Sequence, residues 1–174
     1  MPEACWCQVQ GSELHQGDFL PEIHVPLFRS PFVDGEVGDE VEASTEVQSK
    51  DVIIVTQTCD LVNEKIRFVA LCPVETVQAM ETQQPKFAKR WNEVRIGRHE
   101  GLHMLGPLSP DENHKNGLIV DFREIISLPT GYVQKHAIAC GERFRLLSPF
   151  LEHFSQAFGK FYMRVALPDF IAIP

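Results

Sequence analysis

The chain lacks the features that mark secreted, membrane-spanning and nucleic-acid-binding proteins. Its five cysteines (Cys5, Cys7, Cys59, Cys72 and Cys140) are an odd number at irregular spacing, so we expect no disulfide framework. No apolar run reaches the length of about 18 residues that a membrane helix needs, and no apolar segment of the signal-peptide kind opens the chain. Lys and Arg number 16 against 24 Asp and Glu, a net charge of −8 that gives no general attraction to nucleic acid or anionic membranes. We therefore expect a cytoplasmic protein with free thiols and no membrane contact, which could meet nucleic acid only through a local basic patch.

Motifs for common cofactors are missing as well. The sequence contains no phosphate-binding loop, no G-x-G-x-x-G and no G-x-S-x-G, so no cofactor is predicted. Apolar residues make up 44% of the 174 residues and charged residues 23%, which is typical of a globular domain that buries a core. The length suits a single domain over residues 1–174. The composition does not identify a binding partner, and self-association into a homodimer is one of the arrangements it allows.

Alternating and β-branched segments predict a small sheet. Residues 17–28 predict a strand that Pro21 and Pro26 interrupt or border. Residues 52–56 form a strand buried on both faces, and residues 66–72 form its antiparallel neighbour. A short strand at 103–105 and a longer one at 118–128 follow. Residues 1–16 are an irregular lead-in, and the acidic segment 29–50 is an exposed loop or hairpin.

Two segments follow a helical period. Residues 74–97 predict a helical insertion of one broken helix or two short ones, and residues 149–166 predict an amphipathic helix with Phe150, Phe154 and Phe158 on one face. Strands and helices do not alternate regularly. The fold class is therefore α+β, a small and mostly antiparallel sheet or barrel covered by a C-terminal helix.

A polar group follows directly after the buried strand at 52–56. If the chain stays extended, Gln57 and Cys59 point to the same side, and Asp60 lies beside the thiol. Asp60 would raise the pKa of the thiol, so an activating base must come from elsewhere. Cys59 is either a functional thiol or a buried structural cysteine with Asp60 capping the turn.

Residues 99–103 spell H-E-x-x-H. On a helix, His99 and His103 would bind zinc with Glu100 as general base. Gly101 lies inside that segment and makes a helix poor, and Ser109 stands where the extended motif has a third histidine. Neither Glu124 nor His114 is selected as a third ligand by spacing, so no metal site is predicted.

Opposite charges stand two residues apart in the strand at 118–128. Asp121 and Arg123 could bind a phosphate or carboxylate through the guanidinium, or they could form an ion pair on the sheet surface. Arg143, Arg145 and Arg164 flank the C-terminal helix, where they could line a pocket or meet the acidic residues 34–46.

Three segments resemble a group of small uncharacterised bacterial proteins. In that group a TQ-x-CDL segment, an LVVDFR-like strand and an SPF…LSQAF…FMRV-x-LP ending recur in this order. They match residues 56–61, 118–123 and 148–168 here, so the likeness covers residues 17–168. In similar proteins residues 101–105 look like a strand with one histidine, here His103, which disfavours the zinc motif.

The order of elements is also similar, more distantly, to the PemK/MazF-like toxin barrels. The resemblance implies an SH3-like barrel with added helices and a relation to toxin–antitoxin systems. In those ribonucleases an Arg near the second strand and a Ser or Thr after the third carry out RNA cleavage. Thr76 stands at the place of the hydroxyl, whereas Ser49-Lys50-Asp51 stands where Arg-Pro is expected.

We expect a binding or regulatory module of this barrel type with a polar pocket around Cys59. The pocket would contain Gln57, Cys59, Asp60, His103, Asp121 and Arg123, with Thr76 as a further binding residue. The alternative is an enzyme, either an altered endoribonuclease or a thiol hydrolase in which His103 activates Cys59. A zinc hydrolase built on residues 99–103 is a third option.

Overall fold

A computed structural model describes residues 4–28, 45–109 and 114–163, and within these residues the chain forms one mostly antiparallel sheet with five α-helices. Hydrogen-bonded neighbours run in the order β1-β8-β2-β3-β4-β6-β5, and β7 pairs with β4 off this path. The strands are β1 (Trp6–Val9), β2 (Asp18–Phe28), β3 (Thr45–Ile54), β4 (Phe68–Thr76), β5 (Leu102–Leu105), β6 (Leu118–Asp121), β7 (Ile126–Pro129) and β8 (Arg143–Leu146). The predicted α+β class is confirmed.

The helices are short except near the C-terminus. They are α1 (Thr58–Val62), α2 (Val77–Gln83), α3 (Trp91–Arg95), α4 (Thr130–Cys140) and α5 (Phe150–Tyr162), with 3-10 turns η1 (Pro85–Lys89) and η2 (His114–Asn116). Among the described residues, every helix is too short or too polar to cross a bilayer. The predicted C-terminal helix corresponds to α5, and residues 164–166 of that prediction lie outside the described residues.

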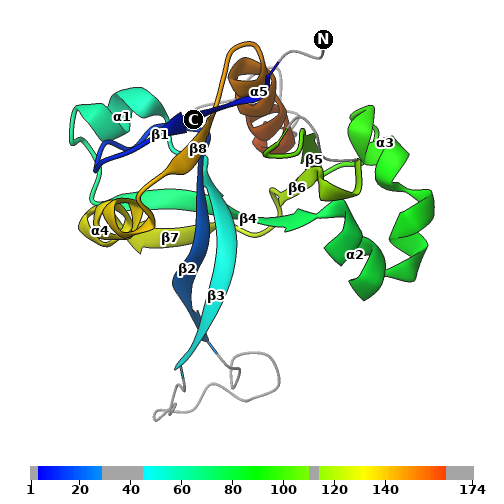
Figure 1. Cartoon of the computed structure of the whole chain (residues 1–174), viewed down its shortest axis with the longest axis horizontal. Coiled ribbons are helices and arrows are strands. Elements are labelled where there is room, and N and C mark those ends of the chain that lie inside the picture. The colour runs from blue at the N-terminus through cyan, green and yellow to red at the C-terminus, as the bar shows by residue number, and fades with distance from the viewer. Residues whose placement is uncertain (1–3, 29–44, 110–113, 164–174) are drawn as a thin grey trace, which may run out of the picture.

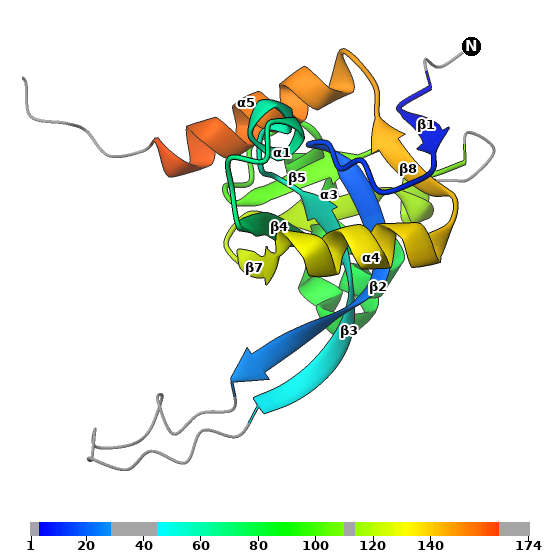
Figure 2. The ribbon, with the colours of Figure 1, turned by 90° about the vertical axis from the view of Figure 1, so that its left-hand side faces the viewer.

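Two helices cover opposite faces of the sheet, as Figure 2 shows for α4 and α5. In β3, Val52 and Ile54 belong to the core cluster beneath α4, whereas Ile53 belongs to the cluster that includes Phe154 of α5. All three β3 side chains are fully buried. The prediction that this strand is buried on both faces is confirmed, because alternating side chains enter two separate cores.

The strands β2 and β3 extend together beyond the rest of the molecule as a two-stranded arm (Figures 1 and 2). They stay paired from Phe19 opposite Ile53 to Phe28 opposite Thr45, with an irregularity in register between Leu20 and Ile23. Of the predicted loop or hairpin at 29–50, residues 45–50 belong to β3, which pairs antiparallel with β2 and so agrees with the hairpin alternative. Residues 29–44 of that prediction lie outside the described residues.

The long strand β4 joins two parts of the fold. Residues 68–71 pair with β7, and residues 74–76 pair with β6. Beyond β4, the helices α2, η1 and α3 form a lobe at one end of the molecule (Figure 1), with Val77, Phe87 and Val94 buried beneath them. The predicted helical insertion begins at Val77 rather than at residue 74, because residues 74–76 complete β4.

The predicted single strand at 118–128 is interrupted. It forms β6 and β7, both antiparallel to β4, with a turn at residues 122–125 between them. The backbone amide of Arg123 donates to the Asp121 side chain at 2.9 Å instead of to a carbonyl of a neighbouring strand. This local hydrogen bond ends β6 at Asp121. Four more strands and helices escaped prediction. Strand β1 lies inside the expected lead-in 1–16, α1 follows β3, α4 follows β7, and β8 precedes α5.

Among the described residues the sheet is not closed. The path of hydrogen-bonded strands ends at β1 on one side and at β5 on the other, and these two strands do not pair. The structure shows an α+β fold with a mostly antiparallel sheet, but it does not confirm the expected SH3-like barrel.

Candidate functional site

Gln57, Cys59 and Asp60 form one exposed group at the start of α1. The Cys59 Sγ lies 3.6 Å from Gln57 Oε1 and 3.8 Å from Asp60 Oδ1. Asp60 also lies 3.8 Å from the Lys65 ammonium. The two side-chain contacts of the Cys59 thiol are therefore both to oxygen atoms of neighbouring residues in the chain.

Gln16, which the sequence did not single out, joins two of the motif segments. Its backbone amide donates to Thr58 Oγ1 at 3.1 Å, and its side-chain amide donates to the Val55 carbonyl at 3.0 Å. Ser155 Oγ of α5 donates to Gln16 Oε1 at 2.8 Å. Residues 56–61 and α5 are therefore held together by one residue, Gln16, which is 8% exposed and uses its backbone amide for the first contact and its side chain for the second.

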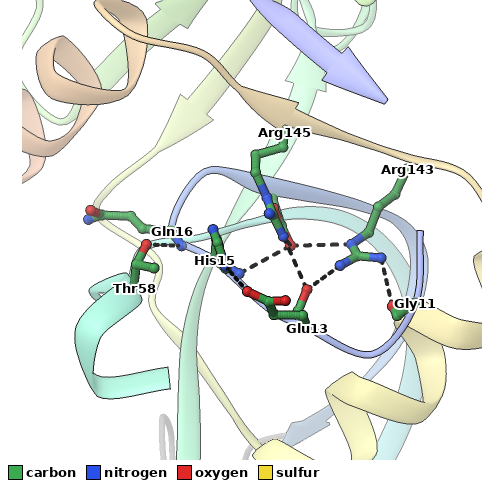
Figure 3. Close-up of polar contacts among 8 residues, drawn as sticks. Gly11, Glu13, His15, Gln16, Thr58, Arg143 and Arg145 are labelled. Carbon is green, nitrogen blue, oxygen red and sulfur yellow. Dashed lines mark hydrogen bonds and ion pairs between the residues drawn. The ribbon is translucent and has the colours of Figure 1, made fainter. Parts of the chain in front are cut away.

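A buried ion network next to Gln16 fixes residues 11–18 (Figure 3). Asp18 lies 3.2 Å from the Arg143 Nε and 2.5 Å from the Arg145 Nε, and the side chains of Asp18 and Arg143 are fully buried. Arg143 also donates to the carbonyls of Gly11, at 2.8 Å, and of Glu13. Because these partners occupy both guanidinium groups, the network holds a loop in place rather than a ligand. Arg164 and residues 34–44 lie outside the described residues.

His103 is the second predicted catalytic residue, and it lies in β5 between aromatic rings. Its imidazole stacks on Phe122 at a centroid distance of 5.8 Å and contacts Phe154 at 5.9 Å. Burial, with a smaller effect of the charge on His153, lowers the pKa of His103 to about 4. The imidazole is neutral at pH 7 and too weak a base to take a proton efficiently from a thiol.

The H-E-x-x-H segment does not form a helix. Residues 99–101 are a turn that leads into β5, so His99 and His103 are not one helical turn apart on a single face. Across residues 4–28, 45–109 and 114–163, no group of three or more His, Cys, Asp or Glu side chains has the geometry to hold a metal ion. The geometry for a zinc hydrolase is not formed here.

Asp121 and Thr76 line a cavity of about 480 Å³ between β3, β4, β6 and α2, which we call the acidic cavity. Five carboxylates face it, and Lys50 is the one cation of its described lining. The carboxylates are those of Glu22, Asp51, Glu75, Asp121 and Glu124.

Most of these carboxylates already have partners. Arg123 binds Asp121 through two nitrogens, at 2.8 and 2.5 Å, which confirms the predicted contact between these two residues. Lys50 lies 2.5 Å from Glu124, and Asp51 accepts the amide of Glu22 at 2.8 Å. By contrast, Glu75 Oε2 is buried and has no hydrogen-bond partner among the described residues.

The predicted pocket residues therefore do not share one pocket but lie in separate parts of the structure. Asp121 and Thr76 line the acidic cavity, whereas His103 lines a smaller one of about 260 Å³. Within the described part of the chain, no hydrogen bond or ion pair joins the Cys59 group to His103, Asp121 or Arg123. The convergence of these residues was only partly predicted, because Glu22, Lys50 and Glu75 reach the acidic cavity from strands whose pairing register the sequence analysis did not derive. Comparison of the chain with protein-family models, with curated proteins and with solved structures finds no match.

Proposed function

We propose that this chain is a binding or regulatory module and that its ligand is an organic cation held in the acidic cavity. The observation that carries the proposal is the buried, unpartnered oxygen of Glu75 at the wall of that cavity. A buried acceptor without a hydrogen bond costs about 1–3 kcal/mol, more when it is charged. A ligand ammonium or guanidinium would supply the missing donor and reduce the excess of negative charge.

The surroundings indicate which cation would fit. A neighbouring hollow of about 500 Å³ shares Glu22, Asp51 and Thr76 with the acidic cavity. Its other lining residues are mostly apolar, namely Phe19, Pro21, Leu108, Asn116 and Leu118. A cation that carries an apolar group would place its charge beside Glu75 and its apolar part against these side chains.

Catalysis receives less support from the geometry. The Thr76 hydroxyl, which the resemblance would use for RNA cleavage, accepts the Ala79 amide at 3.1 Å as the N-cap of α2. Among the described residues, the Cys59 thiol makes no hydrogen bond to a histidine, and the imidazole of His103 is neutral at pH 7. We retain the relation to toxin barrels as part of the proposal. A mostly antiparallel sheet with added helices is compatible with that relation.

Calorimetric titration with benzylamine tests the proposal, with benzyl alcohol as the uncharged ligand of the same shape. We expect benzylamine alone to bind, and we expect Glu75→Gln to weaken it about tenfold because a charge-assisted hydrogen bond is lost. Glu93→Gln is the matched control, since Glu93 is an exposed residue of α3 that does not line the acidic cavity. Equal binding of the two ligands, or an equal effect of the two substitutions, would refute the proposal.

A further inference from the structure

The smaller cavity, of about 260 Å³, has the opposite electrostatic character, and we call it the basic cavity. It lies between the turn at 97–101, β5 and α5. Arg98, His99 and Lys160 supply nitrogen groups, and Glu100 is the one carboxylate of its described lining. The remaining wall consists of Gly97, Gly101, Leu102, His103, Phe122, Ala157 and Phe161.

The two cations of this cavity, Arg98 and Lys160, form no ion pair with another described residue. By comparison, the cation of the acidic cavity, Lys50, is paired with Glu124. Two unpaired cations beside one concave surface attract anions.

The segment that leads to Arg98 strengthens this attraction. Residues 86–98 contain the exposed cations Lys86, Lys89, Arg90, Arg95 and Arg98, and Glu93 is the only acidic residue in the segment. This concentration of positive charge occurs in a chain whose net charge is −8. The cations of this segment therefore favour anions near the basic cavity.

The wall of the cavity is aromatic and closely packed. Phe122 and Phe161 line it with the neutral imidazole of His103, which can donate or accept a hydrogen bond. Gly101 has φ +80°, and a Cβ there would lie 2.7 Å from Arg123 Cγ and 3.1 Å from Phe161. The turn thus needs glycine to sit this close to α5 and β6.

We propose that the basic cavity binds a small aromatic anion, a single planar ring that carries a phosphate or a carboxylate. The anionic group would bind Arg98 and Lys160, and the ring would contact Phe122 and Phe161. The volume limits the ligand to about one ring with its acidic group, because pockets for drug-sized molecules begin at about 300 Å³. This site is separate from the acidic cavity and does not depend on the function proposed for it.

Titration of the full chain with phenyl phosphate tests this site, with inorganic phosphate and benzylamine as comparison ligands. We expect phenyl phosphate to bind more tightly than inorganic phosphate, and we expect the Arg98→Gln/Lys160→Gln double variant to bind it at least tenfold more weakly. The Lys86→Gln/Lys89→Gln variant removes the same charge from the same lobe outside the cavity, and we expect less than a twofold effect.

Three results would overturn the proposal: no binding of phenyl phosphate at millimolar concentration, equal affinity for inorganic phosphate, or an equal loss in both double variants. Benzylamine distinguishes the two sites. Its binding should respond to Glu75→Gln and not to Arg98→Gln/Lys160→Gln, so failure at one cavity leaves the result at the other interpretable.

Discussion

The Ser155 hydroxyl of α5 donates a 2.8 Å hydrogen bond to Gln16 Oε1 across 139 residues of sequence. Gln16 in turn donates to the carbonyl of Val55, the residue that follows β3. Two segments that were singled out for their sequence motifs are thus connected through a residue that belongs to neither.

Gln16→Ala should therefore lower the free energy of unfolding by about 2–3 kcal/mol, because two buried hydrogen bonds are lost together. Urea unfolding followed by circular dichroism measures this. Gln48→Ala is the control, since Gln48 is exposed on β3 and should change stability by less than about 0.5 kcal/mol. Equal effects of the two substitutions would mean that Gln16 does not join these elements.

Asp18 and Asp121 each bind an arginine, but their burial differs. Asp18 and Arg143 are fully buried, whereas the Arg123 side chain is 52% exposed beside Asp121. Asp18→Asn should cost about 3–5 kcal/mol because it leaves the buried guanidinium charges uncompensated. Asp121→Asn should cost no more than about 1 kcal/mol, since water screens that pair. Chemical denaturation of both variants compares them, and similar losses would contradict the buried network.

The burial of His103 predicts a loss of stability in acid. Its pKa is about 4 in the folded protein and about 6.5 when unfolded, so the unfolded chain binds more protons between these values. The contribution of neutral His103 is therefore fully present above pH 6.5 and is lost progressively as the pH falls towards 4, with a total on the order of 2–3 kcal/mol.

The slope of unfolding free energy against pH between 4 and 6.5 measures this contribution. We expect His103→Gln to flatten the slope, while His24→Gln, at an exposed position of β2, should leave it unchanged. An unaltered slope in His103→Gln would show that another group controls the acid response.

Two glycines of the same turn separate backbone strain from packing. Gly97 has φ +70° with open space around it, whereas Gly101 has φ +80° with Arg123 in the way of a Cβ. Each alanine substitution should cost about 1 kcal/mol from the left-handed backbone, and Gly101→Ala should cost about 1–3 kcal/mol more from the clash. The difference between the two melting temperatures reports the clash alone, and equal melting temperatures would disprove it.

The elements that the sequence predicted well are those in which one signal dominates. The β-branched residues 52–54 predicted a strand buried on both faces, and the spacing of Phe150, Phe154 and Phe158 predicted α5. Helix α4 escaped prediction because only Val133 and Ala137 are buried in it, while Ile138 is 57% exposed. Two small buried positions one turn apart give too weak a period to detect.

The candidate sites were less predictable because they depend on tertiary register. Asp121 was selected for its charge pair with Arg123 and Thr76 from the resemblance to the toxin barrels, and both line one cavity. Glu75 carries the unpartnered oxygen, yet it looks like any acidic residue near the end of a strand. The basic cavity is formed by a turn and by the far side of α5, and no local pattern relates Arg98 to Lys160.

The pairing of β4 determines which strands a bound ligand would stabilise. Strand β4 pairs with β7 and β3 along its first part and with β6 along its last, so β6 and β5 are hydrogen-bonded to the remaining sheet through this strand. The acidic cavity spans that connection, with Lys50 from β3 on one side and Asp121 from β6 on the other. A ligand bound there would contact both parts of the sheet and stabilise their arrangement. Amide protons of β5 and β6 should therefore exchange more slowly with solvent when the ligand is bound.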